Sequence, residues 1–584
     1  MKKKIFNTLL VLAGVTVIVS CGKSFLEQKP LGALDENVLA NQAGVEGLLI
    51  GAYSLLDGYG AGGNWDASGS NWVYGGVVGG DAHKGSDAGD QGDIVPMEKY
   101  QATSTNGYFN NKWKTVYEGV ARCNNTLRIL AKATGISAAD VKRITAEARF
   151  LRGHYHFEAK KMWNMVPYVD ENNTELKPTN TADIWPKIEA DFQYAYDNLF
   201  EVAPDNKVGR ANKWAAGAYL AKTKMYRKDF AGAKPILAAV IANGKTSTGT
   251  KYALNARFDA SFDADTKNSP EAVFSVQYSV NDGANGDNGG WGDVLNFPYT
   301  GGPGGCCGFY QPTQDLVNSY QTDAVTGLPI SVDNNYPTGG YNVIRTVKND
   351  EGLQSSDPFT PDTRPLDPRL DWTVGRRGIP YRDWGPHPGQ QWIRDQAYSG
   401  PYAPIKNTYK KSQEGVLTDK SFWTAGVTAN NYTLIRFADV ILMAAECEVE
   451  AGTLAQAMAY VNQIRQRAAN PAGFVKKSDG TPAANYVIGL YTIASFPDQA
   501  TARKIVKFER KLELAMEGHR FFDLARWGDT QATLQAYVNY ESTLRAFLKG
   551  VTVKATSAYF PIPQAQIDQS SSGGKPTLTQ NPGY

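Results

Sequence analysis

The chain has 584 residues and a formal net charge of +2, from 60 lysines and arginines against 58 aspartates and glutamates. A near-neutral chain lacks the concentrated positive field that nucleic-acid binding needs, so we expect no nucleic-acid partner. Five histidines, five cysteines and no CxxC pair argue against a zinc site, and we expect no cofactor. The length is sufficient for a large core and for more than one domain.

The start of the chain has the pattern of a lipoprotein signal. Three lysines at 2–4 precede a mostly apolar run at 5–19, which is too short to span a bilayer. Ser20 stands directly before Cys21, which is the pattern that a lipoprotein signal peptidase cleaves. We therefore predict lipidation of Cys21 and anchoring to a membrane by acyl chains, at about 0.8 kcal/mol per buried CH₂. The alternative is an ordinary signal peptide in which Cys21 is incidental.

Stretches with helical periodicity and few breakers follow, largely in pairs. They lie at 35–56, at 113–133 with 146–163, at 212–243 and at 434–469. In the last two stretches a polar cap, Asp229 or Thr453, separates two helices, and alanines occupy matched positions around it. Small residues at matched positions allow close helix packing, as in tetratricopeptide-like helix pairs. We predict a scaffold of divergent helical repeats.

Two long loops combine glycine with aromatic residues. Residues 58–92 hold 12 glycines and residues 281–310 hold 10, while a third stretch, 372–402, is rich in Pro, Trp and Tyr. No GxxxxGK[ST] run is present, so phosphate binding is not indicated. Flat rings on an adaptable backbone can instead stack on the apolar faces of sugars, while polar side chains bind the hydroxyls.

Loop position and side-chain chemistry together predict a glycan-binding platform. The ligand-binding residues that we predict are Trp65, Asn71, Trp72, Asp81, His83, Trp291, Tyr299 and Tyr310. The alternative for each ring is a buried anchor that holds its loop against the core.

The same loops carry four aspartates between Asp81 and Asp93, and the adjacent pair Cys306 and Cys307. Carboxylates can bind calcium, but the ligand order of an EF-hand is missing, so we favour a solvated acidic loop and expect no metal. Adjacent cysteines can form a vicinal disulfide in an oxidising compartment, but we favour two free thiols.

A charged helical block at 503–527 carries Glu509, Glu513 and Glu517 at intervals of four residues. These carboxylates could imitate a catalytic pair, but cations of the same block surround them at i±3 and i±4, which indicates ion pairing. The cations are Arg503, Lys507, Arg510, Lys511 and Arg520. With no GxSxG or HExxH motif either, we predict that the protein is not an enzyme. A glycoside hydrolase stays open as an alternative because it needs only two carboxylates.

Five sequence blocks occur in a fixed order along the chain. They are SFLEQKP after Cys21, EARFLRGHYHFEAKKMWNMVPYV, LIRFADVILMAAECEVEAG, FERKLELAMEGHRFFDLARWG, and the terminal pair YFPIPQAQID with QNPGY. Together they resemble the SusD/RagB family of outer-membrane lipoproteins over nearly the whole mature chain. The third block departs from the family pattern at Cys447, where alanine is usual.

The resemblance implies a mostly α-helical fold, with a tetratricopeptide-like helix-pair scaffold and an irregular, loop-rich half containing short strands. It implies a lipid-anchored protein of the cell outer membrane that captures glycan and delivers it to a SusC-like TonB-dependent barrel. An oligopeptide-binding or other nutrient-binding member is the alternative. The resemblance assigns structural roles to Glu509, Glu517, Arg520, Asp523 and Arg526, and it assigns no binding residues.

We divide the chain by these features into four parts. Residues 1–20 are the signal peptide, and residues 21–250 form an N-terminal part with helix pairs and the first glycine-rich loop. Residues 251–433 form a loop-rich ligand-binding insertion, and residues 434–584 form a C-terminal part with helix pairs and the family signature.

Overall fold

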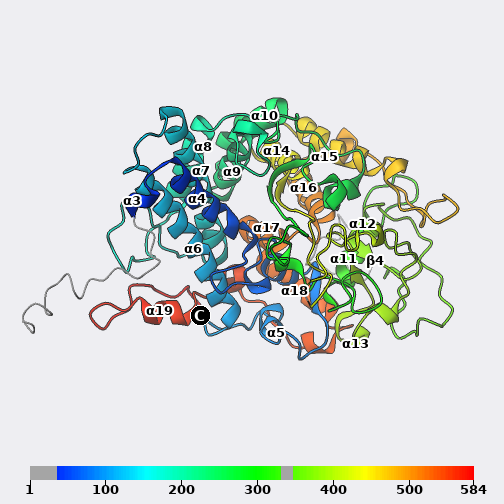
Figure 1. Ribbon diagram of the computed structural model, residues 1–584. Coiled ribbons are helices and arrows are strands. Elements are labelled where there is room, and N and C mark those ends of the chain that lie inside the picture. The colour runs from blue at the N-terminus through cyan, green and yellow to red at the C-terminus, as the bar shows by residue number, and fades with distance from the viewer. Residues whose placement is uncertain (1–35, 331–345, 422) are drawn as a thin grey trace, which may run out of the picture.

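The computed structural model describes residues 36–330, 346–421 and 423–584, and the architecture is mostly helical (Figure 1). The predicted signal, the lipidation site Cys21 and the SFLEQKP block lie outside the described residues. Within the described part, no helix has the length and hydrophobicity needed to cross a membrane.

Helices that follow one another in the chain pack against one another and form the left and upper parts of the view in Figure 1. The first series is α4 (Gln42–Tyr53), α6 (Gly107–Leu130), α7 (Ala138–Trp163), α8 (Trp185–Asn198), α9 (Lys213–Tyr226) and α10 (Phe230–Asn243). The short helix α3 (Glu36–Leu39) precedes it. α10 then packs on α14 (Phe437–Ala451), which also contacts α15 (Leu454–Ala468) and α16 (Gln499–Leu514). This continuous stack of helices is the predicted scaffold.

The predicted helix pairs are confirmed where polar caps separate two helices. The Asp229 carboxylate accepts a hydrogen bond from the Gly232 amide and begins α10, and the Thr453 hydroxyl accepts one from the Gln456 amide and begins α15. The stretch predicted as helix from residue 434 begins instead as strand β6 (Tyr432–Arg436). Helix α8 lies outside the predicted stretches.

The other elements before α14 are short. The helices are α5 (Ile94–Glu98), α11 (Gln314–Ser319), α12 (Leu370–Thr373) and α13 (Gln396–Ser399). The strands are β1 (Ala82–Gly85), β2 (Ala272–Val276), β3 (Phe309–Pro312), β4 (Val374–Gly375), β5 (Ala403–Pro404) and β6. They form antiparallel pairs, β1 with β3, β2 with β6 and β4 with β5. Of these elements, α11, α12, α13 and β4 lie on the right of Figure 1.

The charged block at 503–527 is two helices and not one. α16 ends at Leu514, and α17 (Arg520–Trp527) begins after a turn, followed by α18 (Thr530–Glu541) and α19 (Gln564–Gln569). Within the turn, Gly518 has φ +68°, and a Cβ at this position would lie 1.9 Å from the Ser70 carbonyl oxygen. Glycine is therefore required where the C-terminal block rests on the first glycine-rich loop.

Candidate functional site

The two glycine-rich loops are joined into one body. β1 of the first loop pairs with β3 of the second, so that His83 lies opposite Gln311. The Ser70 hydroxyl donates to an Asp293 carboxylate oxygen at 2.6 Å, and the Trp72 indole donates to the Gly292 carbonyl at 3.1 Å. The two glycine-rich loops therefore meet in the structure.

The glycines of the first loop serve close packing. A Cβ on Gly76 would lie 2.0 Å from the Tyr310 hydroxyl oxygen and 2.5 Å from a ring carbon of the same side chain. A Cβ on Gly75 would lie 1.7 Å from the Gly518 carbonyl oxygen. Both distances are far inside contact range, so only glycine lets the Tyr310 ring and the 515–519 turn approach this backbone.

The expectation that the rings of Trp72, Trp291 and Tyr310 are presented on the surface is wrong. Their exposed fractions are 1%, 2% and 4% respectively. The Trp291 indole donates to the Gly286 carbonyl at 2.9 Å, and its ring stacks on Tyr59 at a centroid distance of 5.4 Å. These rings act as anchors, which was the alternative for each, because buried aromatic side chains contribute a large share of the stability of a core.

The polar residues predicted to bind sugar hydroxyls, Asn71, Asp81 and His83, are also buried. The Asn71 amide donates to Glu158 at 3.0 Å, and Asp81 accepts from the Met516 amide at 3.0 Å. Burial raises the pKa of the Asp81 carboxyl to about 6. In this conformation none of the three side chains faces a surface that a sugar could occupy.

His83 is held between two buried carboxylates. Its Nδ1 lies 2.8 Å from Glu98 Oε1 and its Nε2 lies 3.3 Å from Glu541 Oε2, so β1 is tied to α5 and α18. Burial disfavours the imidazolium, but the hydrogen bonds to Glu541 and Glu98 outweigh it and raise the pKa of His83 to about 9. The arrangement is a buried ionic tie.

Two predicted residues, Trp65 and Tyr299, are only half-buried. The Trp65 indole donates to Gln91 at 3.0 Å, so it is fixed against the first loop. The Tyr299 ring lies under the Arg394 guanidinium, at 5.3 Å from the ring centroid. The exposed parts of these two rings are available to a ligand.

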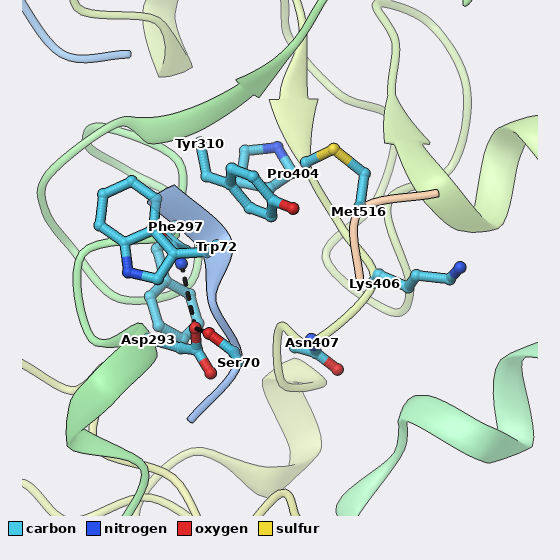
Figure 2. Close-up of a pocket in the computed structure, with 10 residues that line it drawn as sticks. Ser70, Trp72, Asp293, Phe297, Tyr310, Pro404, Lys406, Asn407 and Met516 are labelled. Carbon is cyan, nitrogen blue, oxygen red and sulfur yellow. Dashed lines mark hydrogen bonds between the residues drawn. The ribbon is translucent and has the colours of Figure 1, made fainter. Parts of the chain in front are cut away.

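Figure 2 shows the cavity where the two loops meet, lined by Trp72, Tyr310 and Asp293 of the loops together with Lys406 and Met516. Its volume is about 20 Å³, which is room for about one water molecule. A sugar ring does not fit there, so the buried junction is a structural joint and not a ligand pocket.

Two aspartates of the acidic stretch at 80–93 are held by a distant arginine and by Lys84 of the stretch itself. Arg394 pairs with Asp87 at 2.6 Å and with Asp90 at 2.8 Å, and the Lys84 ammonium donates to the backbone carbonyls of both aspartates. Across the described residues no group of three or more His, Cys, Asp and Glu is arranged to hold a metal ion. The stretch is an ion-paired turn and is less solvated than we expected.

Cys306 and Cys307 form a disulfide in the structure, so the expectation of two free thiols is wrong. Gly304, two residues before the bond, donates its amide hydrogen to the Tyr409 hydroxyl at 2.6 Å and accepts from the Thr424 hydroxyl at 2.8 Å. The half-exposed Cys306 therefore lies on a loop that is fixed at its base by segments far along the chain.

Trp423 is a candidate that sequence reasoning missed. All twelve tryptophans of the chain lie in the described ranges, and Trp423 is the most exposed of them, with 53% of its surface accessible. Its neighbour Thr424 binds Gly304 of the disulfide loop, and the preceding segment accepts hydrogen bonds from Asn281 at the carbonyls of Gly415, Val416 and Thr418. The available signal was the aromatic pair Phe422 and Trp423 in the mostly polar run 418–428, where no apolar periodicity predicts burial.

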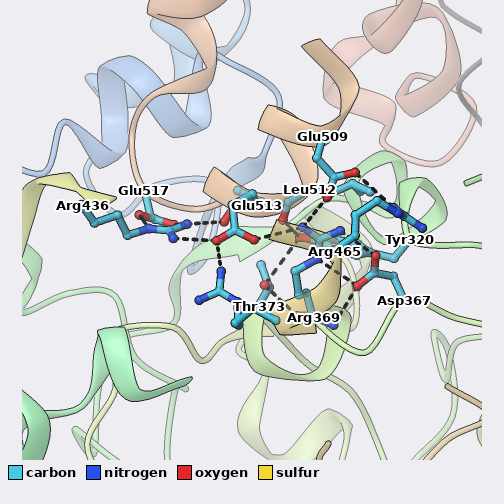
Figure 3. A network of polar contacts seen from close by, with 12 residues as sticks. Tyr320, Asp367, Arg369, Thr373, Arg436, Arg465, Glu509, Leu512, Glu513 and Glu517 are labelled. Atoms are coloured by element: carbon cyan, nitrogen blue, oxygen red, sulfur yellow. Dashed lines mark hydrogen bonds and ion pairs between the residues drawn. The ribbon is translucent and has the colours of Figure 1, made fainter. Parts of the chain in front are cut away.

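The glutamates of the C-terminal block lie in a buried ion network, shown in Figure 3. Glu513 accepts from Arg436 at 2.6 Å, from Arg369 at 3.0 Å and from Arg467. Burial opposes the charge, but the three arginines hold the pKa of the Glu513 carboxyl well below its usual range. The ion pairing is as predicted, whereas these partners come from other parts of the chain and not from the block itself.

Long-range pairing also explains Glu509 and Glu517. Glu509 pairs with Arg465 at 3.1 Å, and Glu517, which lies beyond the end of α16, pairs with Arg436 at 2.8 Å. A carboxylate clamped between arginines in the interior is poorly suited to accept or donate a proton. The network therefore fastens α16 to the loop-rich part and provides no catalytic pair.

The fold and its surface define a class of protein. A helical repeat scaffold carries long loops, which buried aromatic rings hold in place and which expose a few other aromatic rings to solvent. The chain belongs to the SusD family, whose model matches residues 270–584. A second family model, described as "Starch-binding associating with outer membrane", matches residues 25–225.

Known relatives agree with this assignment. SusD-like protein P2 of Formosa agariphila is 25% identical over 547 residues, covering 90% of each chain. Among solved structures, surface glycan-binding protein A from Bacteroides fluxus superposes with a TM-score of 0.61 at 23% identity, over 93% of this chain and 100% of the other. A laminarin binding SusD-like protein gives a TM-score of 0.58 at 21% identity, again over 93% and 100%. At these identities the structures support the fold.

Proposed function

We propose that this protein is a surface-exposed glycan-binding lipoprotein without catalytic activity. It is anchored in the outer membrane through Cys21, captures oligosaccharide or polysaccharide, and delivers it to a SusC-like TonB-dependent barrel. Membership of the SusD family supports this role, as do the names of structural relatives that bind laminarin or surface glycans. The helical scaffold offers the face on which the barrel docks, since helical repeat surfaces commonly host protein partners.

The exposed indole of Trp423 beside the disulfide loop is the observation that carries the proposal. The Trp423 indole has 53% of its surface in water, and sugars offer apolar C–H faces that match such a ring. The half-exposed Tyr299 ring of the same loop provides a second stacking face. At about 1 kcal/mol per ring, stacking gives a modest affinity, which suits a protein that must release its ligand to a transporter.

Affinity gel electrophoresis against a polysaccharide panel tests the proposal, on protein that begins after Cys21. We expect one glycan class to retard the protein, and Trp423→Ala and Tyr299→Ala to weaken that binding about fivefold each, the equivalent of about 1 kcal/mol. Phe200→Ala is the matched control, because this ring is 49% exposed at the end of α8, on the helical side.

The outcomes separate the alternatives. Full binding by both loop variants would place the glycan elsewhere on the protein. If no polysaccharide of the panel retards the protein and oligopeptides bind to it, the ligand is a peptide. Release of reducing sugar from a retained polysaccharide would show catalysis and contradict the proposal.

A further inference from the structure

A cavity of about 360 Å³ lies between α16, α17 and α18, which run down the middle of Figure 1. This volume is within the range of about 300–1,000 Å³ that is typical of small-molecule sites. It is far larger than the joint between the glycine-rich loops. Phe508, Leu524 and Trp527 form the apolar part of its lining.

The polar lining of this cavity is strongly basic. Four cations, Arg503, Lys504, Lys507 and Arg520, line it, together with a single carboxylate, Asp529. Two of the cations are neutralised: Arg503 pairs with Glu450 at 2.6 Å, and Lys507 pairs with Asp529 at 2.5 Å. The other two cations make no ion pair in the described residues, although the charge of Arg520 acts from a distance on the buried Asp81 carboxylate.

These two charges belong to Arg520 and Lys504. Neither side chain makes an ion pair or a side-chain hydrogen bond with any other residue of the described ranges 36–330, 346–421 and 423–584. This sets Arg520 apart from the rest of its sequence block, because Glu509, Asp523 and Arg526 are all buried in ion pairs. Its charge acts on Asp81 without direct contact, so the N–H donors of its guanidinium have no acceptor among the described residues.

The chemistry of the free groups indicates their ligand. A guanidinium presents paired N–H donors that match the two oxygens of a carboxylate or a sulfate, and a nearby ammonium adds charge without demanding a fixed geometry. The apolar wall formed by Leu524 and the half-buried Trp527 covers the uncharged part of a small molecule.

We propose that this basic cavity binds an oxyanion group carried on a sugar-sized ligand, such as a uronate or a sugar sulfate ester. Arg520 binds the oxyanion and Lys504 raises the local potential at the mouth. The site is formed by helices of the scaffold, and it is distinct from the loop face with Trp423. Its occupancy does not depend on glycan capture at that face.

Calorimetry at low ionic strength tests this site with four probes: galacturonate, galactose 6-sulfate, neutral galactose and inorganic sulfate. We expect the two charged sugars to bind more tightly than inorganic sulfate, and galactose not to bind. Tighter binding of one charged sugar would identify the carboxylate or the sulfate ester as the preferred source of the oxyanion. Added salt should weaken binding, because the cavity is open to solvent and its charges are screened.

Arg520→Gln should raise the Kd of the charged sugars about tenfold, the loss of about one charge-assisted contact, and Lys504→Gln about threefold. Lys504 is exposed and unpaired in the described part, so its substitution leaves the fold intact even if Arg520→Gln does not. Lys549→Gln is the matched control, since it removes the charge of another exposed lysine that lies outside the cavity lining.

Equal binding of galactose and galacturonate, equal weakening by Lys549→Gln, or no measurable binding of any anion would each overturn the proposal. Trp423→Ala must leave the affinity for charged sugars unchanged, and Arg520→Gln must leave retention by a neutral polysaccharide unchanged. These two crossed measurements distinguish failure of the basic cavity from failure of glycan capture at the loops.

Discussion

Replacing Trp72 by alanine distinguishes an anchoring ring from a ligand-binding ring. The Trp72 side chain is 1% exposed, its indole donates to the Gly292 carbonyl at 3.1 Å, and its ring meets Tyr310 edge-on at 5.7 Å. All these contacts join the first glycine-rich loop to the second. The substitution should therefore destabilise the protein, and any effect on glycan binding should follow from the loss of loop structure.

The cost can be worked out from the burial. An aromatic side chain buries roughly 150–250 Å², which at about 25 cal/mol per Å² corresponds to about 4–6 kcal/mol. Tryptophan-to-alanine substitutions in protein cores cost about 3–5 kcal/mol, because alanine retains part of the contact and the surroundings relax. We expect about 4 kcal/mol for Trp72→Ala. In a cooperative unit of about 550 residues this lowers the thermal midpoint by about 3–4 °C.

Urea denaturation and thermal melting of the soluble form, followed by far-UV circular dichroism, measure this effect. Trp423→Ala removes the same side chain from a position that is 53% exposed, and it should change the free energy of unfolding by less than about 0.5 kcal/mol. A loss below about 1 kcal/mol for Trp72→Ala would refute the anchoring role. So would an equal loss for the two variants.

Two further predictions concern charged groups. The pKa of His83, raised to about 9 against a usual 6.5 by Glu541 and Glu98, gives stability that is fully present below pH 6.5 and is lost as the pH rises through 9. The free-energy difference between the unsubstituted protein and His83→Gln should fall by up to about 3 kcal/mol between pH 6 and pH 9.5, and a constant difference would contradict the ionic tie. Glu513→Gln leaves three buried arginines short of a partner and should cost about 3–5 kcal/mol in urea denaturation, whereas Glu36→Gln, at an exposed pair, should cost less than about 1 kcal/mol. Equal losses for these two variants would contradict that account.

The scaffold was predictable because its signals are local. Asp229 and Thr453 cap the second helix of their pairs through hydrogen bonds to amides three residues on, and such a cap is visible in the sequence. The break within the 503–527 block was not visible, because Gly518 is there to approach the Ser70 carbonyl, a contact between distant segments. The domain boundaries at 250 and 433 stay predictions.

The site was less predictable because burial of a loop residue is decided by its distant partners. Trp72 lies between Asn71 and Val73, and Trp423 lies between Phe422 and Thr424, so each has one polar and one apolar neighbour in the sequence. The Trp72 indole nevertheless donates to Gly292 in the interior, whereas the Trp423 ring lies in solvent. The prediction of the ion-pair partners of Glu513 was wrong for the same reason. The sequence predicts cations of the same block at i±3 and i±4, but the partners Arg436 and Arg369 lie 77 and 144 residues away in the chain. Periodicity carries no information about such pairs.

The buried anchors Trp72, Trp291 and His83 are separate from the exposed rim, by which we mean the rings of Trp423 and Tyr299. This separation has a consequence for ligand specificity. Trp72, Trp291 and His83 satisfy their polar groups inside the protein, so the positions of the loops do not depend on any ligand. Trp423 and Tyr299 contribute little to that joint, and substitutions of exposed residues usually change stability by less than about 0.5 kcal/mol. The rim can therefore change its ligand preference while the anchors keep the two loops in register on the same helical scaffold.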